Sequence, residues 1–510
     1  MIKRNLLLSL ALLSALQTLA EEIPFGLSSP FSHHMVLQRE QAIPVWGRSD
    51  PGDEVTVEFA GQRKTGVTNA DRQWRVTLDP LKASAVGREL VVKLGNFPQH
   101  TFTNVVVGDV WLCSGQSNMA FRMAETANAQ AEIAAASPPN VRFLTVSTYF
   151  DQQPRNGFHG VWRSVNPASA AECSAVAYYF GRALQPKVGV PIGLVISSVG
   201  GTRIETWMRA ETLAATGLAG SLRDKWSKIS PDEFQTIDTV YRDYQHQVYQ
   251  MHPLAVKAAK AEGKPAPPAP PMPKLRCHDC PSALHNGMIA PLESIPFRGV
   301  IWYQGESNSQ QPAAYEQLLP ALIADWRRVW GAELPFLFVQ LAPHRNTPPA
   351  FREAQHRIWQ RTPNTAMVVT IDVGDVQNIH PTRKRPVGER LALAARALSY
   401  GEPIEYSGPL FDGLKIENDR AIVSFTHLGG GLMAKGDVLK GFTIAGAGGK
   451  FVPARAEIDG ANVVVTADEV SNPVAVRYAW ANAPQGNLFN SAGLPAAPFR
   501  SDSPRRLETE

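Results

Sequence analysis

The sequence has little of what marks a disulfide scaffold or a nucleic-acid-binding protein. Only four of its 510 residues are cysteine, which is too few for disulfide bonds to organise an exported chain of this length. Lysine and arginine total 50 against 46 aspartate and glutamate, and they are scattered rather than gathered into a basic patch. We interpret the one basic triplet, residues 383–385, as a solvated loop. No nucleic-acid partner is therefore expected.

Two of the cysteines, Cys277 and Cys280, form a C-x-x-C pair. A zinc site needs a second such pair, which the sequence lacks, so we expect neither a metal nor another cofactor. A local disulfide and two free thiols are both compatible with this spacing. Cys113 and Cys173 lie in apolar surroundings and are expected in the core.

A pronounced apolar run occupies the first 20 residues. Lys3 and Arg4 precede apolar residues 6–16, which only two serines interrupt, and small residues follow before Glu21. This pattern predicts a secretory signal peptide over residues 1–20. The run is too short to span a bilayer comfortably. We therefore expect an exported protein, periplasmic or extracellular, without a membrane span.

The rest of the chain divides into three regions by pattern. Short alternating runs separated by turn residues predict an N-terminal β domain over residues 21–107. Over residues 108–400 strand-like runs alternate with helical patterns, which predicts an α/β fold with a parallel sheet flanked by helices. An insertion at about residues 210–281 interrupts this region, with a polar helical portion and then six prolines between 265 and 273. Residues 401–510 return to alternating runs and are predicted as a C-terminal β region.

The first motif whose residues could take part in catalysis is Ser-Gly-Gln-Ser-Asn-Met at residues 114–119, directly after an apolar run. A strand that ends in a glycine-containing turn presents the next hydroxyl at the carboxyl edge of its sheet. A helix that starts there directs free N–H groups at that hydroxyl. Ser117 is therefore a candidate nucleophile. The alternative is a serine that merely caps a helix.

Three further polar loops are predicted at the same sheet edge, where open α/β sheets place their sites. They hold Gly200-Gly201-Thr202, then Gln304, Glu306 and Asn308, and finally Asn378-Ile379-His380-Pro381. His380 is held by the proline that follows it and is the candidate general base for Ser117. The alternative is an isolated surface histidine.

Together these motifs, with Gly108-Asp109-Val110-Trp111 and residues 286–292, resemble the sialate O-acetylesterase-like branch of the SGNH/GDSL hydrolases. The likeness covers most of residues 23–400. It implies a flavodoxin-like parallel sheet with a Ser–His hydrolase site, in an enzyme that removes acetyl groups from sugars. By this resemblance Ser117 is the nucleophile and His380 the base. The N–H groups of Ser117 and Gly201, with the Gln304 side chain, form the oxyanion hole.

The resemblance fails at one position. The family usually carries aspartate two residues before the histidine, and this chain has Asn378. An amide can orient an imidazole through its carbonyl but does not compensate the charge of an imidazolium. Three interpretations remain: a Ser117–His380 dyad, a carboxylate supplied by Glu306, or reduced activity. We favour the dyad, assisted by Glu306.

The resemblance leaves the acetylated carbohydrate open. The candidates are a sialate 9-O-acetyl ester and a plant cell-wall polysaccharide such as xyloglucan or xylan. A sialate carboxylate needs a cationic partner, for which Arg203 is the candidate. Trp207 and Asn308 are further candidate substrate contacts. The alternative from another functional class is a non-catalytic glycan-binding protein, in which Asn378 marks lost chemistry.

Overall fold

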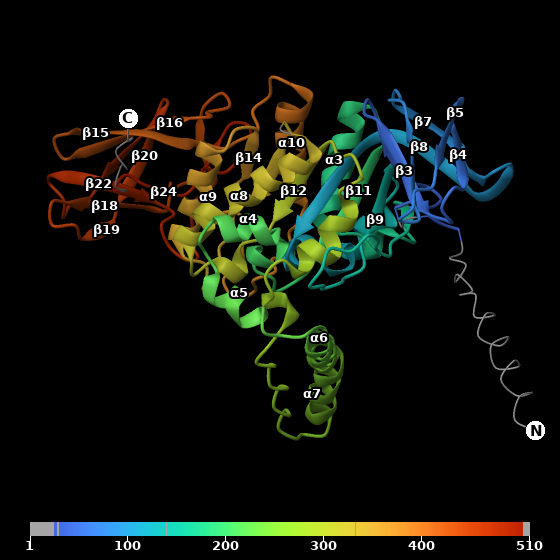
Figure 1. Ribbon diagram of the computed structural model, residues 1–510. Coiled ribbons are helices and arrows are strands. Elements are labelled where there is room, and N and C mark those ends of the chain that lie inside the picture. The colour runs from blue at the N-terminus through green and yellow to red at the C-terminus, as the bar shows by residue number, and fades with distance from the viewer. Residues whose placement is uncertain (1–24, 28–29, 139, 332, 503–510) are drawn as a thin grey trace, which may run out of the picture.

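A computed structural model describes residues 25–27, 30–138, 140–331 and 333–502 (Figure 1). The predicted signal peptide, residues 1–20, lies outside the described residues. Within the described part of the chain, no helix combines the length and the apolar character needed to cross a membrane.

Parallel strands form the centre of the molecule, in the order β9-β11-β8-β12-β13-β14. They are β8 (Phe97–Gly115), β9 (Val141–Thr145), β11 (Ile192–Ser198), β12 (Gly299–Tyr303), β13 (Phe336–Val339) and β14 (Thr365–Val368), and β10 (Trp162–Ser164) adds an antiparallel edge. Without β9, the remaining five have the chain order 2-1-3-4-5 across the sheet. Because these strands are parallel, their carboxyl ends meet at one edge.

Helices cover both faces of this sheet. α3 (Ala175–Val188) packs against α10 (Arg385–Tyr400), and α8 (Pro312–Trp330) packs against α9 (Pro349–Arg361). β12 and β13 are buried at every residue, as expected for parallel strands enclosed on two sides. This double burial explains why these strands read as continuous apolar runs. The prediction of a mixed α/β fold with additional β regions is confirmed.

The N-terminal β region is joined to the central sheet through one strand. It comprises β1 (Gly26–Leu27), β2 (Val36–Gln38), β3 (Ile43–Arg48), β4 (Glu54–Phe59), β5 (Gln62–Val67), β6 (Gln73–Leu78) and β7 (Ser84–Leu94). β8 pairs with β2 and β7 in its first part and with β11 and β12 in its last part. Positions 107 and 108, between which the sequence places a domain boundary, therefore lie within a single strand.

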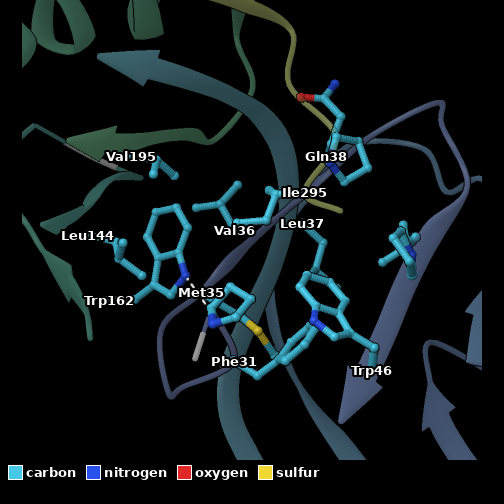
Figure 2. Close-up of a pocket in the computed structure, with 14 residues that line it drawn as sticks. Phe31, Met35, Val36, Leu37, Gln38, Trp46, Leu144, Trp162, Val195 and Ile295 are labelled. Atoms are coloured by element: carbon cyan, nitrogen blue, oxygen red, sulfur yellow. Dashed lines mark hydrogen bonds between the residues drawn. The ribbon is translucent and has the colours of Figure 1, made fainter. Parts of the chain in front are cut away.

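The junction between these two regions is apolar and tightly packed (Figure 2). A cavity of about 30 Å³ remains there, lined by residues that include Phe31, Met35, Trp46 and Trp162. The Trp162 Nε1–H donates to the Pro30 carbonyl at 2.9 Å. This cavity is a packing space between the N-terminal β region and the central sheet.

The C-terminal β region lies at the opposite end of the molecule from the N-terminal one (Figure 1). It holds β15 (Leu410–Glu417), β16 (Arg420–Thr426), β17 (Leu432–Ala434), β18 (Phe442–Gly446), β19 (Phe451–Pro453), β20 (Arg455–Asp459), β21 (Asn462–Thr466), β22 (Pro473–Tyr478), β23 (Leu488–Asn490) and β24 (Phe499–Arg500). The fully buried Arg352 on α9 attaches it, donating to the Ala481 carbonyl at 2.9 Å and to the Asn482 carbonyl at 2.7 Å.

The insertion forms an arm that projects from the body (Figure 1). The arm itself consists of α6 (Pro231–His246), a π-helical turn (Gln247–Met251) and α7 (His252–Ala261), and the shorter helices α4 (Ala210–Ala215) and α5 (Gly220–Trp226) precede it. Ser230 and Glu233 form a capping box at the start of α6, which explains why a polar segment begins a helix there.

Candidate active site

Ser117 lies where β8 ends and the short helix α1 (Ser117–Ala120) begins. Gly115 has a φ of +136°, and a Cβ there would lie 2.2 Å from the Tyr303 carbonyl oxygen. Only glycine allows the two strands to approach this closely in that conformation. The Gln116 N–H donates to the same carbonyl at 2.9 Å. The turn therefore places the Ser117 hydroxyl at the carboxyl edge of the sheet.

The structure brings His380 to Ser117 from a loop between β14 and α10. The distance between His380 Nε2 and Ser117 Oγ is 2.7 Å, which is hydrogen-bond reach for a general base. Burial, followed by the positive charge of Lys384, lowers the pKa of His380. A neutral imidazole is therefore favoured, and it can accept the proton of the hydroxyl.

Asn378 does not hold the imidazole ring. Its Oδ1 accepts a hydrogen bond of 2.9 Å from the backbone N–H of His380, and the Asp375 carboxylate accepts from the N–H groups of Gln377 and Asn378. These bonds shape the turn before His380. Among the described residues, His380 Nδ1 has no hydrogen-bond partner.

Glu306 also lies away from the imidazole. Its Oε1 accepts from the Asn118 amide, and its Oε2 is buried without a hydrogen-bond partner in the described chain. Burial raises the pKa of this carboxyl group. The Glu306 carboxylate therefore does not contact His380 in this structure, and no contact supports the hypothesis that Glu306 assists the base directly.

The loop after β11 supplies candidate donors for an oxyanion. A Cβ at Gly200 would lie 3.2 Å from Ser117 Cβ, so this loop is packed closely against the serine. Gly201 follows with a φ of +72°. Within the described residues, the backbone N–H groups of Ser117 and Gly201 have no intramolecular acceptor. Both are therefore available to a ligand.

Gln304 is not available in the same way. Its side chain is fully buried, and its Nε2 donates to the Thr202 carbonyl at 3.1 Å and to Asn308 Oδ1 at 2.9 Å. An amide group has two N–H hydrogens, so neither remains for an oxyanion. In this structure Gln304 instead connects the loop after β11 to the loop after β12.

Two residues predicted as substrate contacts have buried side chains in this structure. Asn308 is 1% exposed; its amide donates to Glu205 Oε2 at 2.9 Å and its Oδ1 accepts from the Ile204 N–H at 2.9 Å. Trp207 is 0% exposed and its indole N–H donates to Thr202 Oγ1 at 3.0 Å. Both side chains hold the surrounding loops together through these hydrogen bonds.

Arg203 is partly exposed but already paired. Its Nη2 lies 2.8 Å from Glu205 Oε1 and also donates to Gln311 Oε1. The carboxylate of Glu205 neutralises this guanidinium, which weakens it as a partner for a sialate carboxylate.

The prediction that Lys384 lies in a solvated loop is wrong. The structure buries it to 1% exposure, and its ammonium donates to Asn118 Oδ1. Lys384 directly precedes α10, and its spacing from the buried Val387 and Leu391, three and seven residues ahead, continues the inner face of that helix. That helical periodicity was the available signal.

The four cysteines are free thiols and buried, so of the two alternatives for Cys277 and Cys280 the structure has the thiols. No group of three or more histidine, cysteine, aspartate or glutamate side chains suited to a metal ion occurs among the described residues.

Comparison with known proteins places the chain in a family. A family model described as carbohydrate esterase, sialic acid-specific acetylesterase, matches residues 107–230 and 283–397. Sialate O-acetylesterases from Mus musculus and Homo sapiens are each 30% identical over 94% of this chain, covering 94% and 92% of their own lengths. The chain belongs to the sialate O-acetylesterase family. This confirms the family predicted from the motifs, and with it the prediction of an esterase.

A solved relative extends the likeness to three dimensions. A carbohydrate acetylesterase from Xanthomonas citri superposes with a TM-score of 0.78 at 35% identity, over 94% of this chain and 100% of that one. The family model leaves residues 231–282 unmatched. That stretch contains α6, α7 and the proline-rich segment, so the arm lies outside the two matched ranges.

Proposed function

We propose that this protein is an exported carbohydrate O-acetylesterase that works through an acetyl-Ser117 intermediate. The observation that carries the proposal is the 2.7 Å contact between Ser117 Oγ and His380 Nε2 at the carboxyl edge of the sheet. Apart from β9, the parallel strands have the order 2-1-3-4-5 of flavodoxin-like sheets, which supports an SGNH-type hydrolase. The signal-peptide pattern at residues 1–20 supports export.

The reaction has two halves. In the first, Ser117 Oγ attacks the acetyl carbonyl carbon while His380 Nε2 takes the hydroxyl proton. The N–H groups of Ser117 and Gly201 stabilise the oxyanion that forms. The intermediate collapses by breaking the bond to the sugar oxygen, which receives the proton from His380. In the second half water attacks the acetyl-serine, His380 takes its proton, and acetate and the free serine hydroxyl are released.

We propose a dyad, because neither Asn378 nor Glu306 contacts the imidazole ring. The imidazolium formed in each half-reaction then lacks a carboxylate partner. A preorganised oxyanion hole contributes independently of that carboxylate, which is how a dyad retains activity.

For the substrate we favour a neutral acetylated polysaccharide, such as xyloglucan or xylan, over a sialate 9-O-acetyl ester. Arg203 favours a sialate only through its positive charge. Glu205 already pairs with that charge, which weakens the case for a sialate carboxylate. The relatives named sialate O-acetylesterase keep the sialate ester as the second candidate.

The test is acetate release from p-nitrophenyl acetate and from a panel of acetylated glycans. Ser117→Ala is expected to leave only a residual rate, on the order of 10³–10⁴ above the uncatalysed reaction. Rapid acid quenching followed by mass spectrometry is expected to find acetyl-Ser117 in the wild type. Near-wild-type turnover by Ser117→Ala would remove the nucleophile assignment, and a protein that binds glycans without releasing acetate would be a binding protein.

A further inference from the structure

A polar cleft of about 570 Å³ lies between the loop that follows β9 and helix α6. Its lining residues are Ser147, Thr148, Tyr149, Phe150, Arg155, Gln235, Asp238, Thr239 and Arg242. The first five belong to the body of the molecule, and the last four belong to the arm, which the family model leaves unmatched. The cleft is therefore built in part by a segment that lies outside the two ranges matched by the family model.

This cleft opens on the same sheet edge as Ser117. β9 is parallel to β11, and β11 is parallel to β8, with Thr145 and Cys113 both level with Ile196. Two strand spacings separate β9 from β8, which is roughly 10 Å. Buried side chains lie between the two places: a Cβ at Gly201 would lie 4.0 Å from His278 Cδ2, and the rings of His278 and Phe150 are 4.6 Å apart.

The side chains of the cleft suit an uncharged, hydroxyl-rich ligand. Arg242 pairs with Asp238 at 2.7 Å, and the Arg155 guanidinium lies 4.4 Å from the centre of the Tyr149 ring. Arg155 also pairs with Asp151 at 3.3 Å, so each cation has its own carboxylate. Such pairs offer donors and acceptors side by side without net charge, as sugar hydroxyls require.

We propose that this cleft is a subsite for a neutral sugar unit of the glycan chain whose acetyl group is cleaved at Ser117. The inference rests on the proposed esterase function. Strands β9 and β8 are roughly 10 Å apart and the cleft lies beyond the end of β9, so the subsite holds a sugar unit other than the one that carries the reacting ester. The arm then selects extended glycans over small acetate esters.

Two threonines on α6 provide a matched test. Thr239 and Thr236 are both exposed, and each hydroxyl donates to the carbonyl four residues earlier at 2.9 Å, but only Thr239 lines the cleft. Thr239→Trp is expected to fill the cleft and to lower kcat/KM on an acetylated xylo-oligosaccharide by about 10-fold or more. Activity on p-nitrophenyl acetate is expected to stay at the wild-type level, and Thr236→Trp is expected to leave both unchanged.

The outcomes separate the two levels of inference. Equal activity of the two tryptophan variants on the oligosaccharide overturns the subsite, as does a loss confined to an acetylated sialate. A Ser117→Ala variant that hydrolyses p-nitrophenyl acetate at nearly the wild-type rate overturns the proposed function instead.

A second inference concerns the buried ammonium of Lys384, which the reaction scheme does not use. The Nζ atom lies 4.9 Å from the centre of the Phe121 ring and 5.4 Å from that of Tyr303, and it donates to Asn118 Oδ1. Burying a cation is costly unless its partners are well placed. Two aromatic faces and an amide oxygen hold this one in a fixed position.

Asn118 links Lys384 to both members of the catalytic pair. It follows Ser117 directly, and its Nδ2 donates to the Ile379 carbonyl at 3.1 Å, immediately before His380. The same amide donates to Glu306, so one side chain connects the serine, the histidine loop and a buried carboxylate.

We infer that Lys384 is a positioning residue. It fixes the Asn118 side chain, and Asn118 in turn keeps the Ser117 hydroxyl and the His380 ring at hydrogen-bonding distance. This inference also rests on the proposed Ser117–His380 chemistry. In a site without a carboxylate on the imidazole, such a network keeps the base aligned with the hydroxyl.

The charge of Lys384 has a second effect that a merely structural contact lacks. The charged or titratable groups that act on His380 are Lys384, Glu125 and His344, and Glu306 acts on Lys384. The pKa of Lys384 is itself lowered to about 7, chiefly by burial. Because its positive charge lowers the pKa of His380, removing it is expected to raise that pKa. The acid limb of kcat/KM then moves to higher pH.

The experiment compares Lys384→Met with Arg383→Met, a neighbour in the same loop that is exposed. Lys384→Met is expected to lower kcat on p-nitrophenyl acetate by about 10–100-fold with little change in KM. It is also expected to move the acid limb of kcat/KM to higher pH. Lys384→Arg is expected to keep the wild-type pH profile, and Arg383→Met is expected to change neither kcat nor the pH profile.

A Lys384→Met enzyme with wild-type kcat and an unmoved acid limb overturns the inference. If that variant does not fold, Asn118→Asp tests the same link, because it keeps the acceptor for Lys384 and removes the donor to Ile379. Wild-type kcat in Asn118→Asp likewise overturns it. Near-wild-type turnover by Ser117→Ala would instead overturn the proposed esterase function.

Discussion

The role of Gln304 separates two expectations that differ in their observable outcome. As an oxyanion donor, Gln304 acts only on the reaction, so Gln304→Ala lowers kcat by roughly 10²–10³ and leaves folding unaffected. In the structure both of its N–H hydrogens are bound, to the Thr202 carbonyl and to Asn308 Oδ1. The structure therefore predicts that the substitution destabilises the protein.

The magnitude follows from these bonds. Each of the two hydrogen bonds contributes about 1 kcal/mol, and leaving the Thr202 carbonyl unpaired costs about 1–3 kcal/mol more. The expected loss in the free energy of unfolding is therefore about 3–5 kcal/mol. Activity is expected to fall with stability, because Thr202 belongs to the loop that carries Gly201.

Urea denaturation of Gln304→Ala beside Gln317→Ala measures this loss. Gln317 is an exposed glutamine on α8 with one bond of 3.4 Å to the Ala313 carbonyl, so its variant is expected to unfold like the wild type. A Gln304→Ala protein with wild-type unfolding and a 10²–10³-fold loss in kcat would refute the reasoning and restore the amide to the oxyanion hole.

Three further predictions concern the same edge. Asn378→Asp is expected to change kcat less than about twofold, since a carboxylate oxygen can accept the backbone N–H of His380 as the amide does; a large activation in steady-state assays would mean that position 378 reaches the ring. The lowered pKa of His380 means that the neutral base is present above that pKa and lost as the pH falls through it, so the acid limb of kcat/KM is expected below the roughly 6.5 of a solvated histidine; a limb above that value contradicts the assignment. Trp207→Ala is expected to cost about 3–5 kcal/mol in unfolding free energy because the indole is fully buried, and a stable variant with a raised KM for glycan would return Trp207 to the substrate.

The order of strands and helices was predictable because it depends on local patterns. Strands enclosed on both faces must be apolar throughout, so β11 and β12 were visible as runs at residues 192–199 and 299–303. The parallel sheet then required their carboxyl ends to share an edge. This placed Ser117 and the loop of His380 together, although 263 positions separate the two residues.

The sequence also determined the family, because short ordered motifs survive where overall identity is 30%. It did not determine what each motif side chain contacts. Asn308 and Trp207 stand in polar loops, where exposure is the ordinary expectation. Only the packing of the loops after β11 and β12 against each other buries them.

The tertiary structure alone decided which polar groups remain free for chemistry. Gln304 finds an acceptor 102 positions away, and Lys384 finds Asn118 at a separation of 266. No local pattern encodes such a pairing, because a hydrogen bond depends on where two distant segments of the chain come together. The sequence by itself thus determined the order of strands and helices, the sheet edge at which the site lies, and the family. The fold decided that the N–H groups of Ser117 and Gly201 stay unbound while the amide of Gln304 does not.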